Sequence, residues 1–177
     1  AAEPILDVYS RPIVATHKSD GSPVTEADER AEAVILDRLA AIGLPVLAEE
    51  SVAAGRIPAL DGRFFVVDPL DGTKEFLKRN GEFTVNIALV ENGRPTLGVV
   101  LAPATGATFV GGPGGAFEIS NRDEHIALHT SAQGPVKVVA SRSHGHGALQ
   151  GFCETFQVVD DISVGSSLKF CLVARGD

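Results

Sequence analysis

A run of four apolar residues at 64–67 leads directly into the polar segment 68–73, which reads DPLDGT. Four large apolar or β-branched residues in succession are typical of a strand that is buried on both faces. The polar segment contains a proline, which fixes φ and lacks an N–H, and a glycine, which permits close approach of the backbone. The pattern therefore predicts a buried strand, an acidic turn and a helix that begins at Thr73.

A helical pattern precedes this strand in the chain. Apolar residues recur at helical spacing between residues 27 and 42, after a polar, turn-rich loop at residues 17–23. Thr25 and Asp28 have the spacing of a capping box, so we expect Asp28 in the first turn of the helix. A carboxylate is favourable at that positive end, and this structural role alone would explain Asp28. Gly43 is expected to end the helix.

A second short strand also ends in acid. The apolar residues 44–48 are followed by Glu49, and residues 51–62 are expected to form a loop. Two neighbouring strand ends that deliver carboxylates suit Mg²⁺, which prefers oxygen ligands and binds readily beside substrate phosphates. The spacing of the acids does not match that of an EF-hand, which disfavours a role in calcium signalling. The structural alternative is that Asp68 and Asp71 only cap a tight turn through their side chains.

The middle of the chain has the alternation of an antiparallel sheet. Residues 83–90 and 96–101 alternate around Asn92-Gly93, which is typical of a tight hairpin turn. Short strands are expected at 108–110 and 116–119, and the glycine cluster between them is interpreted as a turn because it lacks the Lys-Ser/Thr ending of a P-loop. Residues 1–132 are thus expected to form an α+β domain with a mostly antiparallel sheet.

The pattern changes after Gln133-Gly134-Pro135. A strand at 136–140, a helix at 148–156 and a strand at 158–159 predict the start of an α/β unit. A last helix is expected to open with serine caps at Ser166 and Ser167 and to stop at Gly176. Because a single α/β repeat cannot bury its sheet, residues 133–177 are expected to be the incomplete beginning of a second domain.

Composition narrows the class of protein. With 177 residues, 44% of them hydrophobic, the chain can build one substantial core. The net charge of −8 disfavours binding to a nucleic acid polymer, which requires a basic surface. Cys153 and Cys171 lack metal-ligand spacing and are expected to be reduced. The chain has no membrane-span pattern and no signal pattern at its start, so a soluble, cytoplasmic protein is expected.

Six segments together resemble the inositol monophosphatase superfamily of Mg²⁺-dependent, Li⁺-sensitive phosphatases. They are GSPVTEADE (21–29), LAEES (47–51), VVDPLDGTKEF (66–76), NGEFTVNIALVENGRPTLGVVLAP (80–103), VVASRSH (138–144) and GSSLKFCLVARGD (165–177). The KEF that follows DGT, together with SRSH and GSSLKF, is similar to the bisphosphate nucleotidases of that superfamily. The inositol enzymes typically have Thr-Asn-Phe after DGT. The resemblance implies a layered αβαβα sandwich and hydrolysis of 3'-phosphoadenosine 5'-phosphate to AMP and phosphate.

The resemblance also implies roles for individual residues. It implies two or three Mg²⁺ ions, with Li⁺ as an inhibitor. The implied metal ligands are the side chains of Glu49, Asp68 and Asp71 and the carbonyl of Leu70. Thr73 and Asp28 would form a dyad that orients and deprotonates a water, with Glu49 also close to that water, and the amides of Gly72 and Thr73 would hold the scissile phosphate. This assignment agrees with the metal chemistry expected of the two acidic strand ends.

By the same resemblance, four residues would line the nucleotide side of the site: Ser141, His144, Ser166 and Lys169. His144 would lie near the base or ribose, and Lys169 near the other phosphate. Each has a structural alternative: Lys169 could be solvated, His144 could be an ordinary loop residue, and Ser166 could serve only as a helix cap.

The sequence departs from the superfamily at its end. Relatives continue to a Trp-Asp motif whose aspartate is a further metal ligand, whereas this chain ends at Asp177 and contains no Trp. We therefore expect an incomplete metal site. Two alternatives stay open: an inositol or sugar phosphate phosphatase, and a truncated, non-catalytic nucleotide- or metal-binding module. A homodimer is possible because relatives commonly dimerise, and the acidic composition does not support association with a membrane surface.

Overall fold

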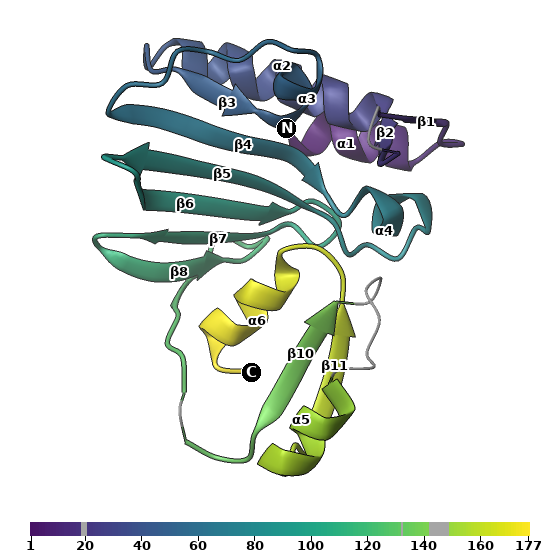
Figure 1. Ribbon diagram of the computed structural model, residues 1–177, viewed down its shortest axis with the longest axis vertical. Coiled ribbons are helices and arrows are strands. Elements are labelled where there is room, and N and C mark those ends of the chain that lie inside the picture. The colour runs from purple at the N-terminus through teal and green to yellow at the C-terminus, as the bar shows by residue number, and fades with distance from the viewer. Residues whose placement is uncertain (19–20, 132, 142–148) are drawn as a thin grey trace.

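A computed structural model describes residues 1–18, 21–131, 133–141 and 149–177 (Figure 1). The helices are α1 (Ala2–Tyr9), α2 (Glu26–Ala40), α3 (Glu49–Ala53), α4 (Thr73–Leu77), α5 (Leu149–Phe156) and α6 (Leu168–Arg175). The strands are β1 (Ala15–His17), β2 (Pro23–Thr25), β3 (Val46–Ala48), β4 (Arg63–Asp71), β5 (Thr84–Glu91), β6 (Arg94–Ala102), β7 (Ala107–Gly112), β8 (Gly115–Ile119), β9 (His125–Ala127), β10 (Lys137–Ser141) and β11 (Asp160–Val164).

Helices and sheets alternate in layers. Seven strands form one sheet in the order β3-β4-β5-β6-β7-β8-β9, in which only the β3–β4 pair is parallel. The helices α1 and α2 cover one face of this sheet, α6 lies between it and the small parallel sheet of β10 and β11, and α5 lies beyond (Figure 1). The predicted layered α+β architecture is confirmed.

The core lies between the helices α1 and α2 and the large sheet. Phe65 and Val67 of β4 point into it and are buried, together with Ile35 of α2. Val66, which points the other way, is 37% exposed. The prediction that this strand is buried on both faces is therefore wrong: its side chains alternate, and only the helix-covered face is fully packed.

The capping box is confirmed, and two short elements beside it were not predicted. The Thr25 amide and hydroxyl both donate to Asp28 Oδ2, at 2.8 and 2.7 Å, and the Ala27 amide donates to Thr25 Oγ1 at 3.2 Å. The expected loop before it contains the antiparallel pair β1–β2. The expected loop at 51–62 begins with the last turn of α3, which is too short to produce a helical period in the sequence.

The predicted hairpin and the helical C-terminal segment are confirmed, with one shift. Asn92 and Gly93 connect β5 to β6 with φ of 51° and 76°, as a type I' turn requires. Gly176 ends α6 in the left-handed region at φ 80°. The strand expected at 158–159 is instead β11, which begins at Asp160. The division at residues 132 and 133 stays a prediction.

Aromatic packing fixes the position of α4. The ring of Tyr9 lies 5.1 Å from that of Phe76 and 4.9 Å from that of Phe83, and the two phenylalanine rings pack edge to face at 5.0 Å. Such pairs contribute roughly 0.5–1.5 kcal/mol each beyond their burial. Arg79 adds hydrogen bonds to the carbonyls of Tyr9 and Arg11. These contacts anchor α4, and with it Gly72 and Thr73 at the start of that helix, to α1 and to the residues that precede β5.

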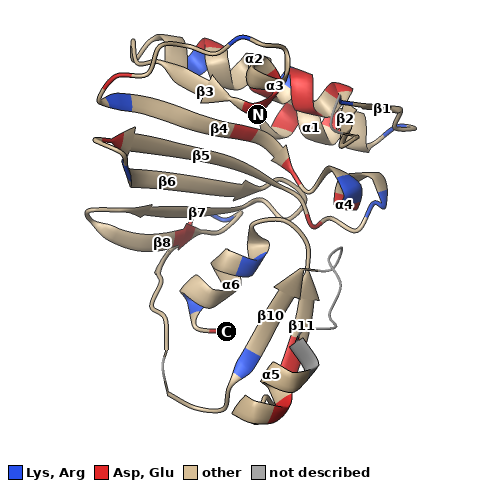
Figure 2. Ribbon diagram, viewed as in Figure 1, with Lys and Arg blue, Asp and Glu red and all other residues tan. Residues whose placement is uncertain are grey.

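Charge is distributed unevenly over these layers. Figure 2 shows acidic segments on β4 where it runs towards α4, and basic segments on α4 and α6 across from them.

Within the described residues, no helix has the length and apolar character needed to cross a membrane. Cys153 and Cys171 are free thiols, as predicted.

Candidate active site

The parallel pairing of β3 with β4 brings the two acidic strand ends together. Ala48 is the register partner of Val67, so Glu49, which directly follows β3, and Asp68, the next residue of β4, emerge at the same edge. Parallel strands deliver their carboxyl ends side by side, which is why two segments about twenty residues apart can share one site. The expected neighbourhood of the acids is thus a direct consequence of strand pairing.

Asp68 has a strongly raised pKa at this edge of the sheet. Burial, followed by the nearby charges of Glu49 and Asp71, raises the pKa of Asp68 from 3.8 to about 8. Its Oδ1 accepts a hydrogen bond from the Leu70 amide at 3.1 Å. A partly buried carboxylate among other carboxylates is unfavourable when it is charged, and a hard divalent cation with oxygen ligands would relieve that cost. The donor set therefore fits Mg²⁺.

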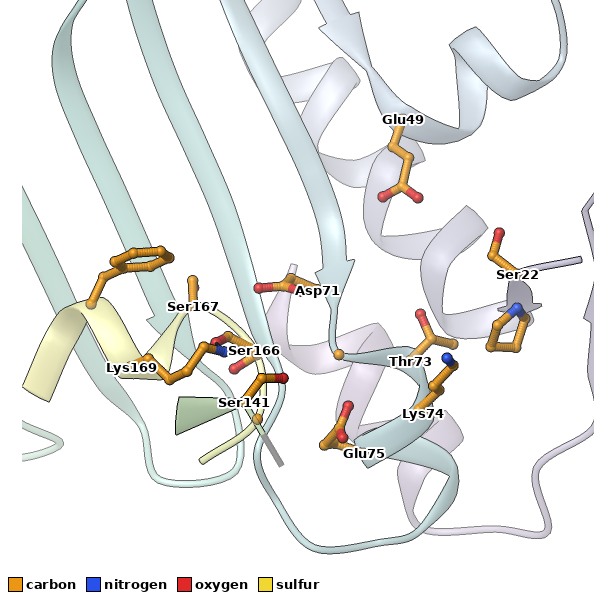
Figure 3. Close-up of a pocket in the computed structure, with 14 residues that line it drawn as sticks. Ser22, Glu49, Asp71, Thr73, Lys74, Glu75, Ser141, Ser166, Ser167 and Lys169 are labelled. Carbon is orange, nitrogen blue, oxygen red and sulfur yellow. Dashed lines mark hydrogen bonds between the residues drawn. The ribbon is translucent and has the colours of Figure 1, made fainter. Parts of the chain in front are cut away.

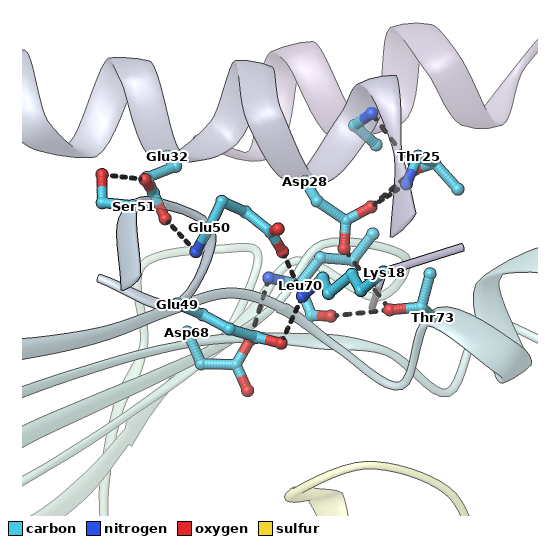
Figure 4. A network of polar contacts seen from close by, with 11 residues as sticks. Lys18, Thr25, Asp28, Glu32, Glu49, Glu50, Ser51, Asp68, Leu70 and Thr73 are labelled. Carbon is cyan, nitrogen blue, oxygen red and sulfur yellow. Dashed lines mark hydrogen bonds and ion pairs between the residues drawn. The ribbon is translucent and has the colours of Figure 1, made fainter. Parts of the chain in front are cut away.

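Lys18 provides the positive charge beside these acids in this structure. Its Nζ lies 2.6 Å from Glu49 Oε1 and 2.7 Å from Glu50 Oε1 (Figure 4). Burial lowers the pKa of Lys18, but hydrogen bonds and charge from both glutamates outweigh that effect, so its pKa is raised. Among the described residues, no three His, Cys, Asp or Glu side chains converge as a ready-made metal cage. Glu49 is turned towards Lys18.

Asp28 and Thr73 meet behind the acids, although 45 residues separate them. Asp28 is 2% exposed, and it divides its two oxygens between two tasks. Oδ2 accepts the capping bonds from Thr25, whereas Oδ1 accepts from the Thr73 hydroxyl at 3.3 Å (Figure 4). The same hydroxyl lies 3.3 Å from the Leu70 carbonyl, so its single proton is shared between two acceptors. Burial raises the pKa of Asp28 above its usual value.

Gly72 lies where the backbone leaves the acidic turn. It has φ 90°, and a Cβ added there would lie 2.9 Å from the Glu82 carbonyl oxygen and 3.1 Å from Ser166 Cβ. Only glycine combines this left-handed conformation with such close approach to a neighbouring backbone.

We expect Gly72→Ala to lower the free energy of unfolding by about 1–3 kcal/mol. The positive φ is strained for alanine, and the new methyl group would lie too close to a backbone oxygen. The matched control is Gly114→Ala, since a Cβ at Gly114 meets nothing within 4 Å. Urea unfolding of both variants measures the difference. Equal stability of the two variants would show that the turn adapts.

A cavity of about 380 Å³ opens beside this turn. Three predicted nucleotide-side residues, Ser141, Ser166 and Lys169, form its opposite wall (Figure 3). Ser166 has φ 52°, which is uncommon for a residue with a side chain and occurs often at functional sites. Lys169 Nζ donates to the Ser166 carbonyl at 2.5 Å. The cavity lining is Ser22, Pro23, Glu49, Asp71, Gly72, Thr73, Lys74, Glu75, Ser141, Gly165, Ser166, Ser167, Lys169 and Phe170.

The structure therefore brings together every predicted site residue that it describes. Glu49, Asp71, Gly72 and Thr73 face the cavity. The other three, Asp28, Asp68 and Leu70, lie directly behind, joined to these residues by the hydrogen bonds and charges given above. His144 lies outside the described residues.

A hydrogen-bonded chain that the sequence did not reveal links the two walls. Asn86 Nδ2 donates to Asp71 Oδ2 at 3.4 Å, and Asn86 Oδ1 accepts from the Ser167 hydroxyl at 2.7 Å. Ser167 Oγ also lies 2.8 Å from Thr84 Oγ1. The prediction that Ser167 caps α6 through its side chain is wrong: it occupies the N-cap position but turns its hydroxyl to β5. The Ser166 hydroxyl instead accepts a 3.4 Å hydrogen bond from the Leu168 amide.

Comparison with known proteins agrees with this geometry. The model of the inositol monophosphatase family matches residues 1–177. The chain is 44% identical over 181 residues to a 3'(2'),5'-bisphosphate nucleotidase CysQ of Salmonella typhimurium, and 43% identical over 181 residues to that of Escherichia coli K12. In both cases the match covers 99% of this chain and 73% of the relative.

A solved structure has the same arrangement of elements. The crystal structure of CysQ from Bacteroides thetaiotaomicron, a bacterial member of the inositol monophosphatase family, superposes with a TM-score of 0.79 at 35% identity. That match covers 99% of this chain and 72% of the other. The family match over the whole chain, the close relatives and the paired acidic strand ends lead to one conclusion. The chain belongs to the inositol monophosphatase family.

Proposed function

We propose that this phosphatase is a bisphosphate nucleotidase that hydrolyses the 3'-phosphate of 3'-phosphoadenosine 5'-phosphate, releasing AMP and phosphate. The observation that carries the proposal is the site itself. The parallel β3–β4 pair brings Asp68 beside Glu49, and Glu49 lines one wall of a cavity whose other wall holds Ser166 and Lys169. The nucleotidases named among the relatives support the choice of substrate.

Glu49, Asp68, Asp71 and the Leu70 carbonyl would hold Mg²⁺. Bound divalent cations supply Lewis acidity, since they lower the pKa of water and offset charge on phosphate oxygens. Asp68 supports this assignment because its charged form is unfavourable when no cation is bound, with its pKa raised to about 8. Lys18 is paired with Glu49 in this structure, so that ion pair would have to break before Glu49 could bind the cation.

Asp28 and Thr73 would prepare the attacking water. Asp28 accepts a hydrogen bond from the Thr73 hydroxyl, so that hydroxyl can accept one from a water in the cavity and pass a proton towards Asp28. Burial raises the pKa of Asp28, which makes it a stronger base than an exposed aspartate. The water oxygen then forms a bond to phosphorus, and the bond from phosphorus to the 3'-oxygen breaks. The 3'-oxygen leaves with the electron pair of that bond and takes up a proton to become the 3'-hydroxyl of AMP.

The two ends of the substrate would be held by different walls. The amides of Gly72 and Thr73 would hold the scissile phosphate, because the backbone there lies open to the cavity. Lys169 would pair with the second phosphate, and Ser141 and Ser166 would contact the nucleotide. The proposal also places His144 near the base or ribose; this residue lies outside the described residues.

A substrate panel tests the proposal. The full 177-residue chain is incubated with Mg²⁺ and either 3'-phosphoadenosine 5'-phosphate, its 5'-phosphosulfate analogue or inositol 1-phosphate, and released phosphate is measured. We expect the nucleotides to be hydrolysed at least about 10-fold faster than inositol 1-phosphate, and Li⁺ to inhibit, since a lost contact with a second phosphate costs roughly 1.5–3 kcal/mol.

Preference for inositol 1-phosphate would instead assign the chain to the inositol or sugar phosphate phosphatases, because the metal-binding edge is shared and only the far wall differs. Tight nucleotide binding without release of phosphate would identify a non-catalytic binding module. Either result would overturn the proposed reaction.

A further inference from the structure

Glu32 is a buried carboxylate that lies outside the cavity. It belongs to α2 and is only 3% exposed. Its Oε2 accepts a hydrogen bond from the Glu50 amide at 2.8 Å, and its Oε1 accepts one from the Ser51 hydroxyl at 2.6 Å (Figure 4). Burying a carboxylate is costly unless its oxygens are well paired, so these two short hydrogen bonds are what stabilise it there.

The partner of Glu32 is the first turn of α3. That helix starts after Ala48, which occupies the N-cap position and has no side chain that can accept a hydrogen bond. An N-cap side chain normally binds the amide of the second or third helical residue. Glu50 is the second residue of α3, so Glu32, by accepting from the Glu50 amide, does from another helix what Ala48 cannot do. Its second hydrogen bond comes from the Ser51 side-chain hydroxyl and ties the third residue of α3 to α2.

This contact bears directly on Glu49. Glu49 is the first residue of α3, so the orientation of its side chain depends on the backbone of that first turn. Glu32 fixes this backbone through its hydrogen bond with the Glu50 amide. Glu49 lines the cavity, whereas Glu32 does not. Glu32 can therefore act on the site only through the orientation of α3, or through its charge at a distance.

We propose that Glu32 is a positioning residue that caps α3 and thereby aims Glu49 at the cation. The inference rests on the proposed function, because it takes Glu49 as a metal ligand. Groups that orient metal ligands typically change metal affinity by about 10–100-fold when they are removed. An orienting role predicts that the shape and hydrogen bonds of the side chain matter, and that its charge does not.

The test compares Glu32→Gln with Glu32→Ala in the full chain. The glutamine oxygen can still accept from the Glu50 amide, and its NH₂ group can donate to Ser51 Oγ, but the charge is gone. Binding of Mn²⁺, used as the probe cation, is measured by titration, and amide hydrogen exchange of α3 is measured without metal. Val8→Ala, a buried substitution in α1, is the control for general loss of stability.

We expect Glu32→Ala to weaken Mn²⁺ binding by about 10–100-fold and to speed exchange at the Glu50 amide. Glu32→Gln is expected to stay within about 3-fold of the wild type in both, as is Val8→Ala in Mn²⁺ affinity. If Glu32→Ala fails to fold, Ser51→Ala removes one of the two hydrogen bonds and should weaken binding more than Glu32→Gln does.

Three results would contradict the inference: unchanged Mn²⁺ affinity in the alanine variant, an equal loss in the glutamine variant, which would show that charge is responsible, or an equal loss in Val8→Ala. A wild-type chain that binds no Mn²⁺ would contradict the proposed function instead. In that case the exchange rate at Glu50, measured without metal, still decides whether Glu32 caps α3.

Discussion

Replacing Asp68 with Asn is expected to reduce phosphate release by about 10³-fold or more, since the cation that Asp68 is proposed to hold would supply several kcal/mol to the reaction. The same substitution is expected to stabilise the metal-free protein at pH 8. Both effects have one cause, because the charge that attracts the cation is unfavourable when no cation is present. The neighbouring change Asp71→Asn should also abolish activity, with little effect on the fold.

The stability effect has a defined pH dependence. The folded-state pKa of Asp68 is raised from 3.8 to about 8, so folding favours the protonated form and the wild type loses stability as pH rises from about 4 to 8. Asp68→Asn lacks this loss, and its advantage should grow to about 1–3 kcal/mol at pH 8.

Thermal unfolding with a chelator at pH 5 and pH 8 measures this difference. Asp37→Asn, an exposed change on α2, removes the same charge as a control. A variant that is less stable than the wild type at pH 8, or that keeps its activity, would show that Asp68 is paired structurally and does not bind a cation.

Disrupting the Asp28–Thr73 pair is the second large effect. Thr73→Val removes the hydroxyl and keeps the shape, and we expect it to lower kcat by about 10²–10⁴-fold, the usual contribution of general acid–base catalysis. Asp28→Asn should lower kcat to a similar extent. It should also cost about 1 kcal/mol of stability, because Asp28 belongs to the capping box of α2.

The double variant distinguishes a pair from two separate residues. If the two groups act as one unit, Asp28→Asn with Thr73→Val loses no more kcat than either change alone. Independent losses that multiply, or a Thr73→Val enzyme within about 3-fold of the wild type, would contradict the proposed dyad. Urea unfolding of Thr73→Val serves as the control, since Thr73 lies outside the capping box.

Local chemistry in the sequence was enough to place most elements. The capping box at Thr25 and Asp28, the Asn92-Gly93 turn and the stop at Gly176 each depend on conformational preferences of a few adjacent residues. Those preferences act over three or four residues, so they are visible without the fold. The acidic turn at Asp68 and Asp71 could be identified for the same reason, and the family resemblance connected it to Glu49 and Asp28.

Tertiary structure decided what those residues face. Val66 is exposed because only one face of β4 is covered by helices, and Ser167 binds Asn86 because the fold brings the N-cap of α6 beside β5. Glu32 and Lys18 gave no local signal, since a lone charged residue on a helix or loop looks like any solvated one. Their partners on α3 are brought near only when the layers pack, because pairing between distant segments depends on the whole fold.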